Sequence, residues 1–285
     1  MSVYIEITND ELKLLEIAKI KKIITIKKAD RTALAYNNSS LDDMYQAIKD
    51  LNYKLKKVTF IENTSNVLYY DMKIPNVSAI KAQLICKNEL VNKLSKQEEL
   101  LVDYFNIKKE SDSENRVLVT GLALLRVTEL MRVSKKLRVK PEIKVAYEGI
   151  FNYLQNMKLF VEGTSILAIE VNANLMKIWL FENDEYVTLR INRIKSESYD
   201  VMLDEINDEV SKIIQFNTTR SLANKITNAY IFGDNEQLTN LVKDLNLDFV
   251  DLDVKMLPIN QNISVPADFN FLANIYSLGM MMGDK

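Results

Sequence analysis

Two short stretches of the sequence place a glutamate at the end of an apolar run and a lysine seven residues further along. Glu6 and Lys13 stand in the first stretch, and Glu170 and Lys177 stand in the second. In a binding site, the carboxylates would hold a cation and the ammonium groups would lie near an anion. In a purely structural role, the glutamates would cap turns and the lysines would be solvated.

Most other catalytic chemistry is excluded by composition. The chain has no histidine, which removes Ser-His and Cys-His catalysis and histidine metal sites. Cys86 is the only cysteine, so an intramolecular disulfide and a thiolate zinc site are both excluded. It lies in an apolar-periodic stretch, which predicts a buried structural residue. We expect no catalytic residue and no metal-ligating set.

The overall composition is that of an ordinary globular protein. Its 285 residues are 47% hydrophobic, which suits two modest domains or one large bilobed domain. A net charge of -2 gives no overall field that would attract nucleic acid or anionic lipid. The N-terminus has no leader pattern, and no window is apolar enough to span a membrane. We therefore expect a cytoplasmic protein in a reducing compartment.

Short apolar runs and helical periodicity order the first half of the chain. Strands are predicted at 3–7, 12–17, 23–26, 58–61, 67–72 and 117–120, and helices from 41, around Cys86, at 122–137 and at 145–157. The polar stretch 108–115 is expected to be a surface loop.

The second half repeats this plan. Strands are predicted at 166–171, 175–181, 186–191, 229–232 and 249–252, and helices at 199–216, 235–245 and 268–281. Residues 5–14 and 169–178 match in their buried positions, glutamate and lysine, which indicates an internal duplication. The sequence therefore predicts an α/β protein with domains 1–162 and 163–285 that meet near Gly163.

Several stretches in order carry a family resemblance. They are the opening hairpin 5–17, the segment 66–90 through Ile74-Pro75, the pair Asp103-Tyr104, the strand and helix 116–141, and the segments 229–241 and 272–282. Together they resemble the PilM-like proteins of type IV pilus assembly, members of the actin-like ATPase superfamily related to FtsA. The resemblance touches nearly the full length.

The resemblance implies an actin-like bilobed α/β fold. An inserted subdomain of the FtsA and PilM type would occupy about 67–140 of the first lobe. The segment between Ile191 and Tyr199 is short compared with the family, which implies a reduced fourth subdomain.

It also implies a cleft for ATP with magnesium between the two halves. The residues that correspond to this cleft are Glu6, Thr8, Asn9, Lys13, Glu170, Asn172, Asn174, Gly233 and Asp234. Glutamates replace the family's aspartates, and Thr8 and Asn172 occupy positions where phosphate loops need glycine. No glycine precedes Gly121. We therefore expect a degenerate cleft with weak or absent hydrolysis.

By the same resemblance, the chain would act as a scaffold at the inner face of the cell membrane. It would bind the N-terminal cytosolic tail of a PilN-like membrane protein and connect indirectly to the pilus motor ATPases, without nucleic acid and without a span of its own. The main alternative is an active actin-like ATPase whose nucleotide state regulates assembly. Weaker alternatives are the cytoplasmic domain of a type II secretion L-protein and a nucleic-acid binder.

Overall fold

The structure is a computed structural model, which describes residues 2–20, 23–34, 41–53, 57–94, 99–196 and 198–283. The contacts divide the chain into two compact units. The first unit comprises 1–150, 260–269 and 276–285, and the second comprises 151–259 and 270–275.

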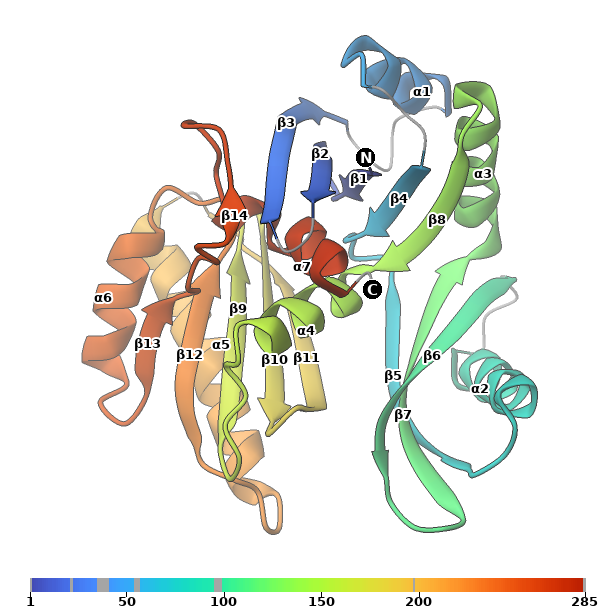
Figure 1. The fold of residues 1–285 in the computed structure, drawn as a ribbon. Helices are drawn as coiled ribbons and strands as arrows, with labels where there is room; N and C mark the ends of the chain where they lie inside the picture. The colour runs from blue at the N-terminus through green and yellow to red at the C-terminus, as the bar shows by residue number, and fades with distance from the viewer. Residues whose placement is uncertain are drawn as a thin grey trace. The chain divides into compact units, whose positions relative to one another are not determined.

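Runs of one to three strands are separated by helices along the chain (Figure 1). The first twelve elements in chain order are β1 Ser2–Ile7, β2 Glu11–Ile20, β3 Ile23–Ala33, α1 Leu41–Asp50, β4 Lys57–Glu62, β5 Leu68–Pro75, α2 Ala79–Leu94, β6 Leu100–Lys109, β7 Glu114–Ala123, α3 Leu124–Leu137, β8 Lys140–Val145 and α4 Ala146–Asn156. The remaining elements are β9 Ser165–Val171, β10 Leu175–Glu182, β11 Glu185–Arg193, α5 Tyr199–Thr219, β12 Ile226–Phe232, α6 Leu238–Asp248, β13 Asp253–Met256, β14 Ile263–Ser264, the 3-10 turn Leu272–Asn274 and α7 Ile275–Gly283.

The main sheet of the first unit has the strand order β14-β3-β2-β1-β4-β8. β1 pairs with β2 in antiparallel fashion and with β4 in parallel, so β1 and β4 end at the same edge of the sheet. α1 and α3 supply Met44, Ile48, Leu130 and Val133 to the core on one face of this sheet. The C-terminal ends of β1 and β4 thus form one continuous edge, where charged side chains can meet.

A smaller sheet with the order β5-β7-β6 carries α2 on one face. Ala82, Cys86 and Leu90 recur at helical spacing on the side of α2 that packs against this sheet. Burial raises the pKa of the Cys86 thiol to about 11, so this cysteine is neutral near pH 7. Its predicted structural role is confirmed.

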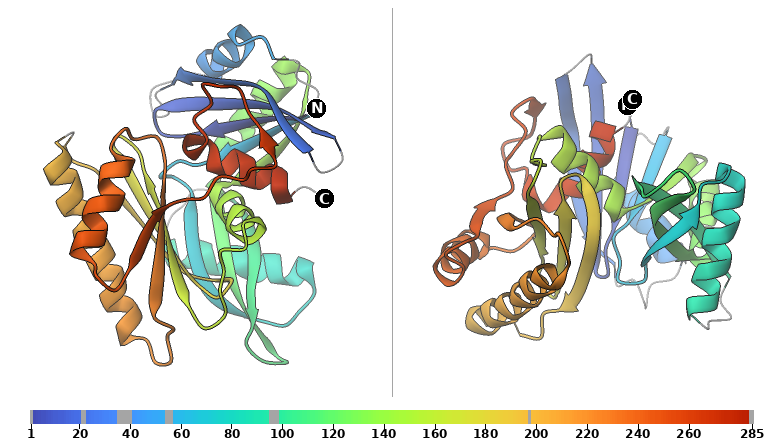
Figure 2. Two further views of the ribbon diagram at one scale, coloured as in Figure 1. Left: turned by 60° about the vertical axis from the view of Figure 1, so that its left-hand side comes forward. Right: turned by 90° about the horizontal axis from the view of Figure 1, so that it is seen from below.

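The second unit repeats the plan of the main sheet. Its strand order is β11-β10-β9-β12-β13, with β9 antiparallel to β10 and parallel to β12. α5 and α6 lie side by side on one face of this sheet in both views of Figure 2, where they are drawn in shades of orange. Their buried leucines, isoleucines and valines complete its core. The two sheets therefore share one topology.

Two glycines allow α4 and α7 to cross closely within the first unit. A Cβ atom on Gly279 would lie 1.8 Å from the carbonyl oxygen of Gly149, and one on Gly149 would lie 2.6 Å from that of Tyr276. Only glycine fits at such a backbone approach. This crossing and the pairing of β14 with β3 attach the C-terminal segments to the first unit.

The inserted subdomain is present and the fourth subdomain is reduced, as predicted. β5, α2, β6 and β7 form the insertion, whereas α3 packs in the core of the main sheet. Residues 194–196 and 198 are the only described residues between β11 and α5. The first compact unit's long segment ends at residue 150, and the second unit begins at residue 151. The domain boundary between residues 162 and 163 stays a prediction.

Some predicted elements were wrong or incomplete. Residues 249–252 form a turn, and the strand begins at Asp253 because Val250 faces solvent with 89% of its surface exposed. β6 and β8 were not predicted, and the expected loop 108–115 includes the tip of the β6–β7 hairpin. Ser40, which forms a capping-box pattern with Asp43 at the start of the helix predicted from 41, lies outside the described residues. Within the described ranges, no helix is long and apolar enough to cross a membrane.

Candidate functional site

Each predicted glutamate faces its own lysine on the neighbouring strand of one hairpin. Glu6 is the register partner of Lys13 in the β1–β2 hairpin, and Glu170 is the partner of Lys177 in the β9–β10 hairpin. All four side chains are buried. The same pairing in both units confirms the internal duplication, and the expectation that the lysines are solvated was wrong.

At the end of β1, the carboxylate of Glu6 is held within the first unit. Its Oε1 atom lies 3.9 Å from Nζ of Lys13 and accepts a hydrogen bond of 2.9 Å from the side-chain amide of Asn63. Lys13 also pairs with Glu11 at 3.3 Å. The backbone N–H of Asn63 donates to the carbonyl oxygen of Ile7 at 2.9 Å, which fixes the end of β4 beside β1. Glu6 is therefore already neutralised and anchored by neighbours.

The turn after β1 is closed by its own groups. Oγ1 of Thr8 accepts hydrogen bonds from the backbone N–H groups of Asp10 and Glu11, at 3.3 and 3.1 Å, and the Thr8 N–H donates to the Glu11 carbonyl at 3.0 Å. The side-chain oxygen of Asn9 accepts from the Ser65 N–H at 3.1 Å. A phosphate loop needs such N–H groups to point at its ligand. In this turn, the N–H groups of Thr8, Asp10 and Glu11 are instead bonded to groups of the turn itself.

Sequence reasoning missed a buried ion pair at the same edge. Glu62 ends β4, and its carboxylate accepts a hydrogen bond of 2.7 Å from Nε of Arg126 in α3, and one of 3.4 Å from the Thr64 hydroxyl. Burial raises the pKa of Glu62, and the guanidinium of Arg126 opposes that rise. The sequence did offer one signal for this site. Glu62 directly follows the predicted strand 58–61, and parallel strands end at the same edge of a sheet.

At the end of β9, the second unit uses the same residue types in a different arrangement. Oε2 of Glu170 lies 3.7 Å from Nζ of Lys177, and Oε1 of Glu170 accepts a hydrogen bond of 2.8 Å from the side-chain amide of Asn172. Asn172 also accepts from the backbone N–H of Asp234 at 2.9 Å. The Asp234 carboxylate accepts from the Asn270 amide at 3.1 Å. These four predicted residues do come together, and Asn270 was missed.

Gly233 is required by packing next to β9. It has φ of +131°, and a Cβ atom there would lie 2.2 Å from the carbonyl oxygen of Val171. A side chain is therefore excluded by the neighbouring strand, whatever ligand is considered. The backbone carbonyl oxygen of Asn174 accepts a hydrogen bond of 3.0 Å from the N–H of Ile194, directly after β11.

The arrangement can hold strand ends together, and it fits a nucleotide poorly. In the described part of the chain, no group of three or more acidic, cysteine or histidine residues is placed to hold a metal ion. The N–H groups of Thr8, Asp10 and Glu11 already have acceptors within their own turn, and Asp234 places a carboxylate two residues after the end of β12. The residues present therefore do not match the glycine-based phosphate loops that ATP with magnesium needs.

Comparison with known proteins places this geometry in a class. No family model and no curated protein matches the chain. A Bacteroides thetaiotaomicron protein described as having an actin-like ATPase fold matches with a TM-score of 0.61 and 12% identity, over 99% of this chain and 96% of that one. Because the two structures match over nearly their whole lengths, the chain has the actin-like fold.

Among solved structures, the fold is similar over its whole length to a chain of the PilM-PilN type IV pilus biogenesis complex. The TM-score is 0.81 at 12% identity, with 100% of this chain and 99% of that chain covered. The cytoplasmic domain of EpsL, an inner-membrane component of the Vibrio cholerae type II secretion system, matches with a TM-score of 0.55 and 6% identity, over 100% and 96% of the chains. The predicted PilM-like resemblance is thus confirmed for the fold.

Proposed function

We propose that this protein is a scaffold of a type IV pilus machine that binds the cytosolic tail of a PilN-like inner-membrane protein through an actin-like fold with a degenerate nucleotide cleft. The fold similarity to the PilM-PilN complex supports the partner. The observation that favours a scaffold over an ATPase is the closed turn at Thr8, in which the N–H groups of Thr8, Asp10 and Glu11 are bonded within the turn. In this proposal the protein works at the inner face of the cell membrane and reaches the pilus motor ATPases through its partners.

The degenerate cleft follows from how the strand ends are filled. Glu6 and Glu170 each have a buried lysine and an amide as partners, so a magnesium ion at either carboxylate would have to compete with those contacts. Desolvated charges are costly unless they are paired, which favours keeping these pairs intact. The nine residues predicted for the nucleotide thus act in this proposal as supports of the two hairpins.

The tail would bind on the face of the three-stranded sheet that α2 leaves uncovered. Leu101 and Phe105 lie on this face of β6, and Leu101 keeps 45% of its surface exposed. The ring of Phe105 lies 5.1 Å from that of Tyr147 in α4. Lys144 and Glu148 form an ion pair of 2.9 Å beside Tyr147. Apolar side chains next to polar groups of both signs suit a short peptide.

Isothermal titration calorimetry with a PilN-type tail peptide tests this proposal. We expect the peptide to bind, and Phe105→Ser to weaken binding by at least about tenfold because an aromatic contact is lost. Ile80→Ser is the matched control, since Ile80 lies on α2 and is 84% exposed. Equal affinities of the two variants for the peptide would show that the peptide does not bind at Phe105. Absence of any heat of peptide binding would contradict the scaffold function.

The rival function is a working ATPase whose nucleotide state regulates docking. Hydrolysis assays with Glu6→Ala as the control separate the two functions. The scaffold predicts no turnover above background in either protein. Turnover in the unchanged chain that disappears in Glu6→Ala would establish the rival.

A further inference from the structure

Helix α3 has an outward face that combines apolar and basic side chains. Leu124, Leu125 and Met131 expose 38%, 71% and 50% of their surfaces. On a helix of 3.6 residues per turn, Arg132 and Lys135 fall on the same side as these three residues. Apolar groups exposed together in this way mark an interaction surface more often than isolated ones do. We call these five residues the α3 surface.

The α3 surface is not needed to hold the helix in place. Leu130 and Val133 on the opposite side are fully buried in the core of the main sheet. Arg126, also buried, pairs with Glu62 at the end of β4. The outward side chains are therefore free to serve a partner without a structural conflict.

The charge of this region is strongly positive at the C-terminal end of α3. Arg132, Lys135, Arg138 and Lys140 are exposed, and none forms an ion pair with an acidic residue in the described ranges. The helix contains one acidic residue, Glu129, which pairs with Arg126 at 3.3 Å. Four cations thus remain available for an anionic partner, although the whole chain has a net charge of -2.

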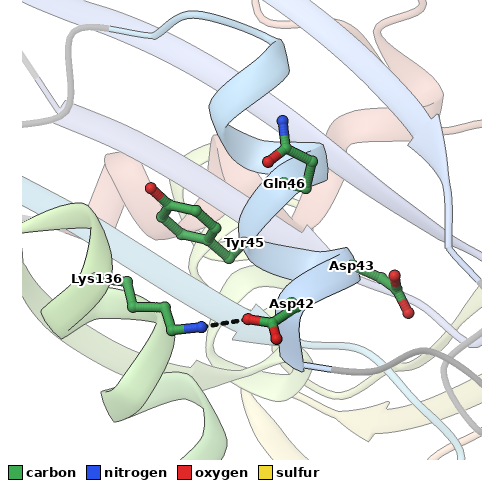
Figure 3. A pocket seen from close by; sticks show the side chains of 5 residues that line it. All are labelled: Asp42, Asp43, Tyr45, Gln46 and Lys136. Carbon is green, nitrogen blue, oxygen red and sulfur yellow. Dashed lines mark hydrogen bonds and ion pairs between the residues drawn. The ribbon is translucent and has the colours of Figure 1, made fainter.

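The side toward α1 marks where the positive region ends. Figure 3 shows Lys136 of α3 reaching Asp42 of α1, beside the ring of Tyr45. These residues line a surface depression of about 570 Å³. Lys136 is therefore neutralised within the protein, whereas the exposed Arg132, Lys135, Arg138 and Lys140 supply the positive charge of this region.

We propose that the α3 surface binds directly to anionic lipid headgroups of a membrane. The outward face of one helix is convex, so it suits a plane better than it suits an extended peptide, which needs a groove. Exposed leucine and methionine can enter the headgroup boundary, while arginine and lysine attract anionic lipids. The contact would be peripheral and would act in addition to any tether through a membrane-protein partner.

Vesicle flotation of the full chain, without any partner, tests this proposal. Vesicles of phosphatidylglycerol mixed with phosphatidylcholine are compared with vesicles of phosphatidylcholine alone. We expect binding to the anionic vesicles only, weakened as salt rises because surface attraction is screened within about 8 Å at physiological ionic strength. The Arg132→Glu/Lys135→Glu variant should bind the anionic vesicles at least about tenfold more weakly than the unchanged chain.

A matched control keeps the result specific. Lys81→Glu/Lys87→Glu changes the net charge by the same amount at exposed positions of α2 and should bind like the unchanged chain. Leu125→Ser/Met131→Ser should lose the binding that persists at high salt. Equal recovery of the chain on both vesicle types, or equal loss in the α2 control, would overturn the proposal. Because no tail peptide is present, either result is independent of the calorimetric test above.

Discussion

The ends of β1 and β9 hold the same buried glutamate and lysine pair but attach it to the next strand differently. In the first unit, the amide comes from Asn63 beyond β4 and reaches back to Glu6. In the second, it comes from Asn172 in the hairpin turn and reaches forward to Asp234 beyond β12. The duplicated scaffold therefore retains the connection while the residues that make it have changed.

The next position along each neighbouring strand differs more. β4 ends in Glu62, whereas Gly233 follows β12 at the corresponding register. Glu62 requires a buried arginine, and Gly233 requires close approach to a backbone carbonyl. The comparison teaches that these edges are specialised for internal packing, in a different way in each unit.

Removing a buried lysine should have the largest effect on stability. Lys177→Met leaves Glu170 buried without its cation, and we expect the free energy of unfolding to fall by about 3–5 kcal/mol. Urea denaturation measures this change. The double variant Lys177→Met/Glu170→Met should recover most of the loss, because neither charge is then buried alone. A loss below about 1 kcal/mol in the single variant would show that the pair is not desolvated.

Arg126→Met should destabilise the first unit in a pH-dependent manner. Burial raises the pKa of Glu62, and loss of Arg126 raises that pKa further. A carboxyl group with a raised pKa in the folded state contributes stability below its unfolded pKa and loses that contribution as pH rises. The variant's deficit should therefore grow from pH 5 to pH 8, reaching about 3 kcal/mol.

Chemical denaturation of Arg126→Met at several pH values checks this sign. Lys212→Met is a suitable control, because Lys212 has an exposed side chain in its pair with Glu209. A deficit that shrinks with rising pH would contradict the assignment of Glu62 as the group responsible.

Gly233→Ala tests whether this glycine serves packing in the second unit. The added Cβ would clash with the backbone of Val171, so we expect a loss of about 2–3 kcal/mol. Gly163→Ala is the control, since Gly163 also has positive φ but has nothing within 4 Å of the added atom. It should cost about 1 kcal/mol from backbone strain alone. Similar melting temperatures for the two variants would contradict the packing role.

The smallest effect is expected at the closed turn. Thr8→Val removes the oxygen that accepts the N–H groups of Asp10 and Glu11, and we expect a loss of about 1 kcal/mol. Thr128→Val removes a hydroxyl that bonds within helix α3 and should have almost no effect. Thermal unfolding of both variants gives the comparison. No difference between them would mean that the turn does not depend on the Thr8 side chain.

Sequence reasoning could find the hairpin pairs because their geometry is local. Glu6 and Lys13 are close in the chain, and the matching spacing of Glu170 and Lys177 reinforced the interpretation. The doubled α/β plan followed from the same apolar pattern. What it misjudged was solvation, since the burial of both lysines depends on the surrounding layers.

Contacts between distant segments could not be predicted in this way. Arg126 lies 64 residues beyond Glu62, and only the packing of α3 on the main sheet brings them together. The strand expected at 249–252 failed for a related reason, because an apolar run does not reveal that Val250 faces solvent. Tertiary context decided both cases.

The most direct test of the central claim is calorimetric titration of the purified chain with magnesium-ATP, alone and with a PilN-type tail peptide. We expect heat from the peptide and none from the nucleotide, because both strand ends are already occupied by internal partners. Tight binding of magnesium-ATP that is lost in Glu6→Ala would contradict it and would establish a nucleotide-controlled switch.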